Sequence, residues 1–230
     1  MKRKFFTVLT VLCMIISRVY ASPFDLFFSK KTLNAFSQRP EESIYCDTVG
    51  HWCNYAAERL FNEDIFQGIK IGKNYYFMPD EYITRGEFLL YLNAVLNIPT
   101  QNSSALPFND ASSIPKWQYP TVYTMYTMGY INGNREKNGL FFNHDEKISR
   151  LECALVLNNM LSINNSSEKT EYYDSYLIPK YALNAVKNVT DYGLMQGYED
   201  KSFRPYVKVT RGMLADILCH AKDLQIDKTP

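Results

Sequence analysis

The most constraining feature of the sequence is a five-residue pattern that occurs three times. Its copies are Ile83-Thr84-Arg85-Gly86-Glu87, Ile148-Ser149-Arg150-Leu151-Glu152 and Val209-Thr210-Arg211-Gly212-Met213. Each copy is a β-branched residue, a hydroxyl residue and an arginine, followed by apolar residues at helical spacing. Internal repetition of this kind predicts an array of similar units, because each short unit must share a core with its neighbours.

The repeated pattern predicts three helix starts. A Ser or Thr oxygen at the N-cap accepts from the third backbone N–H of the helix, and a Glu there reaches back to the N–H of the cap. The first two copies have this Glu, whereas the third has Met213 and predicts a plain cap. Each copy also places an arginine beside the positive end of the helix dipole, which is mildly unfavourable. Three arginines in that position indicate an anionic partner.

Other residues recur at fixed distances from this pattern. An aromatic residue precedes a turn residue by 12 positions each time, a glycine follows that turn residue by 4, and a phenylalanine precedes the arginine by 8. The turn residues Gly129 and Gly193 suit a left-handed helix end, and Asp64 replaces glycine there in the first copy. The recurring residues are Trp52, Trp117 and Tyr181, then Gly68, Gly133 and Gly197, then Phe77, Phe142 and Phe203.

These spacings predict a mainly α chain of three helix–loop–helix repeats, with polar linkers between them. The first helices are expected over 52–62, 117–128 and 180–192, and the second helices from the three arginines to about 98, 163 and 224. The predicted repeats are residues 44–98, 106–163 and 171–226. A lead-in segment, 22–43, precedes them.

The first 21 residues have the features of a secretory signal peptide. A basic start, Lys2 to Lys4, precedes an apolar run that is too short to span a bilayer comfortably, and Val19-Tyr20-Ala21 resembles a cleavage site. We therefore expect an exported protein that is not an integral membrane protein after cleavage. Export permits disulfides among the four later cysteines, but the sequence does not rank their pairings or distinguish them from small buried side chains. Those cysteines are Cys46, Cys53, Cys153 and Cys219.

Charge and residue usage argue against several function classes. The formal net charge is +1, from 25 basic and 24 acidic residues, so nothing indicates a nucleic-acid partner. The sequence has no C-x-x-C pair and no calcium loop, and we expect neither a metal nor a cofactor. The three histidines fall at unlike repeat positions, and no nucleophile–base pair is evident, so we do not expect an enzyme.

The complete pattern resembles the S-layer homology (SLH) domain, a module that anchors exported bacterial proteins to the cell envelope. The resemblance covers roughly residues 44–226 and is most specific at Thr-Arg-x-Glu and at Gly197 to Pro205. It implies a pseudo-threefold, mainly helical bundle with ligand grooves between repeats. The implied partner is an acidic, often pyruvylated, secondary cell wall polymer or a modified peptidoglycan. The implied location is the cell wall or cell surface, or the periplasm if the envelope has an outer membrane.

The resemblance also implies which residues bind the ligand. The arginines would grip the acidic sugar group, the aromatic residues would carry the sugar, and the glycines would let the loop approach it. Backbone N–H groups at the helix starts would add to the arginines' attraction for a carboxylate. The implied ligand-binding residues are Arg85, Arg150, Arg211, Asp47, Asp110, Asp174, Trp52, Trp117, Tyr181, Gly68, Gly133 and Gly197.

Other interpretations of the same residues stay open. The arginines can be braces between repeats in a structural envelope protein or protein–protein adaptor, the Trp residues can be core, and the Asp residues can be turn caps. A wall-active enzyme is a further, less favoured alternative. Asp64, His144 and Met213 depart from the family pattern, so we expect one or two competent grooves rather than three. An unseen protein passenger is also left open.

Overall fold

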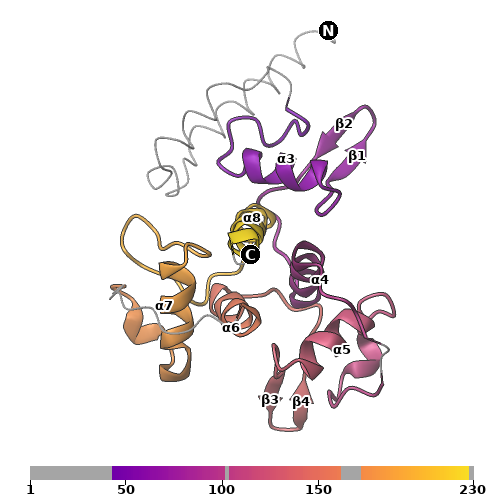
Figure 1. Ribbon diagram of the computed structural model, residues 1–230, viewed down its shortest axis with the longest axis vertical. Coiled ribbons are helices and arrows are strands. Elements are labelled where there is room, and N and C mark those ends of the chain that lie inside the picture. The colour runs from indigo at the N-terminus through magenta and orange to yellow at the C-terminus, as the bar shows by residue number, and fades with distance from the viewer. Residues whose placement is uncertain (1–42, 102–103, 162–171, 228–230) are drawn as a thin grey trace, which may run out of the picture.

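The computed structural model describes residues 43–101, 104–161 and 172–227. Within them, three inner helices gather at the centre and three shorter outer helices surround them (Figure 1). The inner helices are α4 (Arg85–Leu96), α6 (Arg150–Met160) and α8 (Arg211–Asp227), and the outer helices are α3 (Asn54–Asn62), α5 (Tyr119–Thr127) and α7 (Leu183–Asp191). The prediction of a mainly α fold is confirmed. The predicted signal peptide and most of the lead-in lie outside the described residues.

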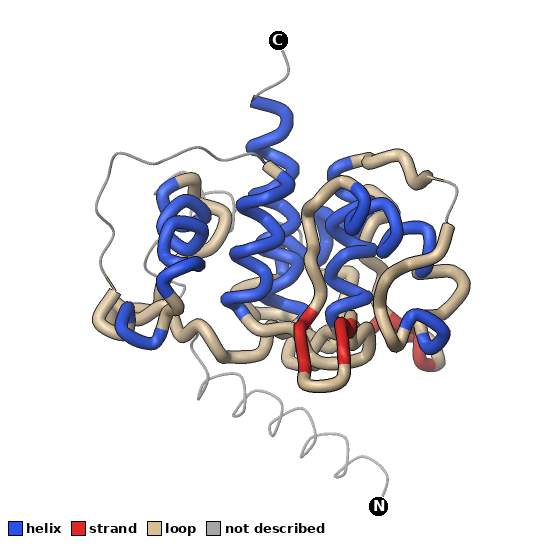
Figure 2. Tube along the Cα trace, turned by 90° about the horizontal axis from the view of Figure 1, so that it is seen from below, coloured by secondary structure: helices blue, strands red, loops and turns tan. Residues whose placement is uncertain are grey.

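Short elements complete each unit. The first unit has α3, a hairpin of β1 (Ile69–Ile71) and β2 (Asn74–Tyr76), and α4. The second has the 3-10 turn η2 (Ala111–Ser113), α5, a hairpin of β3 (Asn134–Glu136) and β4 (Gly139–Phe141), and α6. The third has the 3-10 turns η3 (Ser175–Leu177) and η4 (Lys180–Ala182), then α7 and α8. Both hairpins are antiparallel and lie at one end of the bundle (Figure 2).

The sequence did not predict the two hairpins. They occupy the loops after Gly68 and Gly133, which reach the next phenylalanine in 9 residues, whereas the loop after Gly197 takes 6. The shorter loop of the third unit makes a tight turn instead, with Tyr198 donating its N–H to the carbonyl of Ser202. A three-residue difference therefore decides whether a hairpin forms.

The helix ends follow the sequence prediction closely. Thr84 and Ser149 form complete capping boxes with Glu87 and Glu152, whereas Thr210 accepts only the N–H of Met213, at 3.3 Å. The three turn residues after the outer helices have left-handed backbones, with φ of 56° at Asp64, 75° at Gly129 and 72° at Gly193. The outer helices begin two or three residues later than predicted, because the repeated aromatic residues lie in the turns that precede them.

Each outer helix packs on the inner helix of the preceding unit. Helix α5 contacts α4, α7 contacts α6, and α3 closes the ring against α8. Two ion pairs cross this last joint, Arg59 to Asp223 at 2.6 Å and Lys222 to Glu63 at 2.5 Å. Partly exposed surface pairs of this kind contribute roughly 1 kcal/mol or less each, so the apolar contact of the helices supplies most of the joint's stability.

A closed set of backbone hydrogen bonds lies where the three units meet. The N–H of Ile83 donates to the carbonyl of Val209 at 3.1 Å, that of Val209 to Ile148 at 2.9 Å, and that of Ile148 to Ile83 at 3.2 Å. All three side chains are buried. The β-branched residue that opens each sequence pattern therefore joins the three helix starts to one another.

Glycine after each turn is required by the core. At Gly68 an added Cβ would lie 2.3 Å from the carbonyl oxygen of Tyr76 and 2.4 Å from the ring of Tyr45. The hydroxyl of Tyr45 also accepts the N–H of Gly68, at 2.9 Å. No side chain fits there unless the hairpin backbone moves.

We expect Gly68→Ala to destabilise the protein by more than 2 kcal/mol, because overpacking against backbone costs about 1–3 kcal/mol and the Tyr45 contact is also displaced. Gly50→Ala is the matched control. Its Cβ would meet nothing within 4 Å, and only the positive φ of 73° opposes it, at about 1–2 kcal/mol. Urea unfolding of both variants measures the difference. Equal losses would contradict the steric argument.

Candidate functional site

The three repeated arginines all reach into the next unit around the ring. In each case the side-chain Nε donates to the backbone carbonyl of the phenylalanine that precedes the next inner helix. The pairs are Arg85 to Phe142 at 2.9 Å, Arg150 to Phe203 at 2.8 Å and Arg211 to Phe77 at 2.7 Å. Every arginine therefore joins two units of the fold.

The first N–H groups of the inner helices are also used between units. In α4 the N–H of Arg85 donates to Glu146 and that of Gly86 to His144, both at 2.9 Å. The same two bonds recur at α6, to Val207 and Pro205, and at α8, to Glu81 and Pro79. Groups that a helix start otherwise offers to an anion are therefore occupied by neighbouring carbonyls.

The remaining guanidinium nitrogens distinguish the three arginines. Arg150 is 2% exposed, and its Nη2 donates to the carbonyl of Gln196 at 2.6 Å. The guanidinium lies over the rings of Phe203 and Tyr198, 4.6 and 5.1 Å from their centres, and burial lowers its pKa. Its contacts are those of an internal brace.

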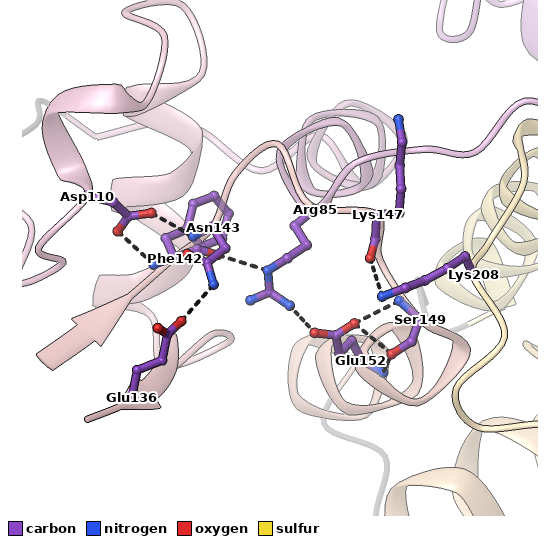
Figure 3. Close-up of polar contacts among 9 residues, drawn as sticks. All are labelled: Arg85, Asp110, Glu136, Phe142, Asn143, Lys147, Ser149, Glu152 and Lys208. Carbon is purple, nitrogen blue, oxygen red and sulfur yellow. Dashed lines mark hydrogen bonds and ion pairs between the residues drawn. The ribbon is translucent and has the colours of Figure 1, made fainter. Parts of the chain in front are cut away.

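Arg211 makes the corresponding bond from Nη2 to the carbonyl of Gln67, at 3.1 Å, and lies over the ring of Phe66. Arg85 differs, because its Nη1 forms a 2.5 Å ion pair with Glu152, the capping-box residue of the second unit (Figure 3). Arg150 meets no such partner, since Met213 replaces the glutamate in the third unit. Arg85 is thus the arginine held by a carboxylate.

Arg85 lines a groove of about 780 Å³. One wall is the loop after α5, from Tyr130 to Arg135, and the floor includes one face of α6. The opposite wall belongs to the third unit, through Tyr181, Tyr206 and Lys208. All three units contribute to this one site.

The groove has an excess of positive charge. Its lining contains three cationic side chains, Arg85, Arg135 and Lys208, and one carboxylate, Glu152. Glu152 already accepts from Arg85 and from the N–H of Ser149 (Figure 3). The Nζ of Lys208 donates to the carbonyl of Lys147 at 2.6 Å, and within the described residues neither it nor Arg135 has a carboxylate within 4.0 Å. Two cations are therefore available to an anionic ligand.

The equivalent rims elsewhere in the ring carry the opposite charge. Tyr206, which lines the groove, and the next residue, Val207, correspond in sequence to Asp80 and Glu81 in the first unit and to Asp145 and Glu146 in the second. These four acidic residues are exposed. The three interfaces are alike in backbone, but the rim of only one of them suits an acidic ligand.

Few of the sequence-predicted site residues meet in the groove. Arg85, Gly133 and Tyr181 line it. Trp117 is 66% exposed and Trp52 is half-buried against the core, and neither lines the groove. Five other groove residues were not predicted from the sequence: Arg135, Lys208, Glu152, Tyr130 and Tyr206. The charged loop after Gly133 could have indicated Arg135 from the sequence.

The three predicted aspartates share a different position, within their own units. Both oxygens of each carboxylate accept consecutive backbone N–H groups of the loop before the inner helix, at 2.7–2.9 Å. The pairs are Asp47 with Phe77 and Met78, Asp110 with Phe142 and Asn143, and Asp174 with Phe203 and Arg204. Each aspartate thus holds the loop before its inner helix, and we call this arrangement the aspartate clamp. A ligand role for the three aspartates stays a prediction.

Two of the predicted glycines lie against the core as Gly133 does. A Cβ at Gly197 would lie 2.3 Å from the ring of Tyr172, and one at Gly133 would lie 2.5 Å from that of Phe108. Gly68 has the equivalent contact with Tyr45. The glycines thus serve the close packing of a leading aromatic residue, and only Gly133 also borders the groove.

The four cysteines of the described part are unpaired thiols. Cys46 is exposed, and Cys53, Cys153 and Cys219 are buried. Burial raises the pKa of all three buried thiols, that of Cys219 to about 12. Such thiols are unreactive. Within the described residues no group of three His, Cys, Asp or Glu side chains could hold a metal ion, and no helix is long and apolar enough to cross a membrane.

We expect Arg150→Ala to lower the free energy of unfolding by about 3–4 kcal/mol, because it leaves one buried and one partly buried carbonyl without donors and opens a cavity. Arg150→Lys should recover only part of this loss, since an ammonium does not reproduce the guanidinium fork. Urea unfolding measures stability, and sedimentation with purified wall measures binding of the folded protein. Unchanged stability with lost binding would contradict the brace assignment.

Comparison with known proteins agrees with this architecture. Residues 107–154 and 171–212 match the family model of the S-layer homology domain. An endoglucanase of Bacillus sp. (strain KSM-635) is 30% identical over 166 residues, 69% of this chain and 16% of the relative. Cell surface glycoprotein 1 of Acetivibrio thermocellus is 28% identical over 97 residues, 41% of this chain and 4% of the relative.

The chain therefore spans less than a fifth of the length of these two curated relatives. The first unit lies outside the two matched ranges, yet it has an inner helix with a Ser or Thr cap, an aspartate clamp and a phenylalanine carbonyl that accepts from an arginine, as the others do. Modules of this family associate proteins with the cell surface. On the matched ranges, the second and third units are S-layer homology domains, and the first unit shares their architecture.

Proposed function

We propose that this protein attaches non-covalently to the cell wall by binding the acidic end of a wall glycan in the groove between its second and third units. The observation that carries the proposal is the groove's lining, with three cations against one carboxylate. Two of those cations, Arg135 and Lys208, have no carboxylate partner among the described residues. An acidic sugar substituent supplies the missing negative charge.

The cations suit a carboxylate or phosphate on the ligand. Arg135 presents a planar fork of N–H donors, and Lys208 presents a compact ammonium on the opposite wall. Arg85 adds charge beneath them while Glu152 holds its position. A pyruvylated amino sugar of a secondary cell wall polymer, or an acidic peptidoglycan-linked glycan, has the required group.

The rest of the lining suits a sugar ring. Three tyrosines, Tyr130, Tyr181 and Tyr206, present flat apolar faces with hydroxyl groups at their edges. Three amides, Asn132, Asn134 and Asn159, offer both donors and acceptors to hydroxyl and acetamido groups. A groove of about 780 Å³ lies within the usual range for small-ligand sites.

A single groove is proposed, although the repeats are three. The acidic pairs Asp80–Glu81 and Asp145–Glu146 at the equivalent rims repel an acidic ligand. Arg150 and Arg211 each donate hydrogen bonds from two guanidinium nitrogens to backbone carbonyls. We therefore propose a stoichiometry of one ligand per chain.

The alternative function, a structural or adaptor protein whose arginines are braces, is supported by Arg150 and its interior contacts. It does not account for the cationic groove. The two interpretations divide among the arginines, with Arg150 and Arg211 as braces and Arg85 as a groove residue. Whether the chain also carries a protein passenger stays a separate proposal.

Charge removal at the groove tests the proposal. We expect Lys208→Gln to weaken wall binding about five- to tenfold, the loss of one exposed charge-assisted contact, and Arg135→Gln/Lys208→Gln to weaken it further. Lys147→Gln is the matched control. It removes the equivalent lysine of the second unit, which does not line the groove. Sedimentation with purified wall, before and after removal of acidic polymer, gives the affinities. An equal loss for Lys147→Gln, or binding to stripped wall, would refute the proposal.

The aromatic residues give a second matched pair. Tyr181 and Trp117 occupy the same repeat position and are both exposed, at 75% and 66%, but only Tyr181 lines the groove. We expect Tyr181→Ala to reduce binding about tenfold and Trp117→Ala to leave it unchanged. Calorimetry with wall fragments should give one site per chain. Three sites, or equal effects of the two substitutions, would contradict a single groove.

A further inference from the structure

Exposed apolar side chains gather on the third unit beside the groove. Four of them form what we call the tyrosine ledge: Tyr176, Leu177, Tyr181 and Tyr206. They are 81%, 42%, 75% and 58% exposed, respectively. Leaving three aromatic rings and a leucine this open to water is unfavourable, and contiguous apolar surface of this kind marks an interaction site.

The second unit shows that the fold does not need this apolar surface. At the positions of Tyr176, Leu177 and Tyr206 the second unit has Ser112, Ser113 and Asp145. Both units still form a 3-10 turn there, η2 and η3, and both keep the aspartate clamp below it. The ledge is therefore present in the third unit and absent from the second, although the two share the same local fold.

The ledge is continuous with the groove. Tyr181 and Tyr206 belong to both, since they form the third unit's wall of the groove. The hydroxyl of Tyr206 donates to the carbonyl of Leu177 at 3.0 Å, which connects the wall to the turn that carries Tyr176. A ligand that leaves the groove over Tyr206 therefore meets Leu177 and Tyr176 next.

The ledge is held in place before any ligand binds. The N–H of Leu177 donates to the carbonyl of Asp174 at 2.9 Å, and the carboxylate of Asp174 is fixed by two backbone N–H groups. Tyrosine side chains lose little conformational entropy on binding. Because this surface is already ordered, binding costs little entropy, and each contact with a ligand adds to the affinity.

We infer that the ledge binds the uncharged sugars that follow the acidic terminal sugar, so that this protein recognises a stretch of polymer and not its end alone. This inference rests on the proposed function of the groove. The ledge has no charged side chain, matching neutral sugars, whereas the groove has the charges that match the acidic one. Pyranose rings have an apolar C–H face and hydroxyl edges, and tyrosine has an apolar ring and a hydroxyl.

The test compares two glycan lengths on the full chain. The probes are a pyruvylated N-acetylhexosamine alone and a tetrasaccharide that ends in the same sugar, with a phosphorylated pair run in parallel. The variant Tyr176→Ser/Leu177→Ser introduces the residues that the second unit already has, so the fold accommodates them. The control is Tyr192→Ser, an exposed tyrosine just past the far end of α7, about 13 Å from the start of that helix.

We expect the unaltered protein to bind the tetrasaccharide at least tenfold more tightly than the single sugar, measured by calorimetry. The double variant should bind the single sugar within twofold of the unaltered protein but retain less than a threefold length advantage. The Tyr192→Ser control should keep both affinities.

Three results would overturn the inference and leave the groove proposal standing. The first is equal affinity of the unaltered protein for both lengths. The second is a double variant that keeps the full length advantage. The third is a double variant that elutes from size exclusion as a smaller species, which would make the ledge a contact between copies. If neither acid-bearing probe of either length binds, the proposed function fails and the inference fails with it.

Discussion

The fold depends on hydrogen bonds that each unit donates to the next around the ring. At every inner helix start, a β-branched residue, an arginine side chain and the first two helical N–H groups all donate to backbone carbonyls of neighbouring units. These groups would otherwise be unsatisfied where the units meet, at a cost of about 1–3 kcal/mol each. The repeated sequence pattern is thus an assembly device, because the first two N–H groups of each inner helix are satisfied by another unit.

This device also explains how one interface came to differ from the others. The Nε bond and the backbone bonds fix the position of all three arginines. Only the contacts of the Nη groups therefore differ from one arginine to the next. At Arg150 these groups are buried against aromatic rings, whereas at Arg85 they meet Glu152 beside open space. A common backbone therefore allows binding chemistry to diverge through single side chains, such as Glu152 and Met213.

The fold was predictable from the sequence to a greater extent than the groove. Capping boxes, left-handed turn residues and fixed spacings are local signals, and they located all six helices to within a few residues. The groove depends on side chains that converge from three units, such as Arg85, Arg135 and Lys208, and no local signal reports that convergence. Family resemblance gave equal roles to equivalent residues. The structure separates them, because burial and neighbouring charge differ at each interface.

The packing of α3 on α8 has a consequence for how the protein folds. The other outer helices pack on inner helices that are close in sequence, whereas Arg59 and Asp223 at this joint are 164 residues apart. The entropy lost in closing a chain segment grows with its length, and distant contacts form more slowly than local ones. We therefore expect the contacts within units two and three to form early and the joint between α3 and α8 to form last. The ring is sealed by the contact between its first and last helices.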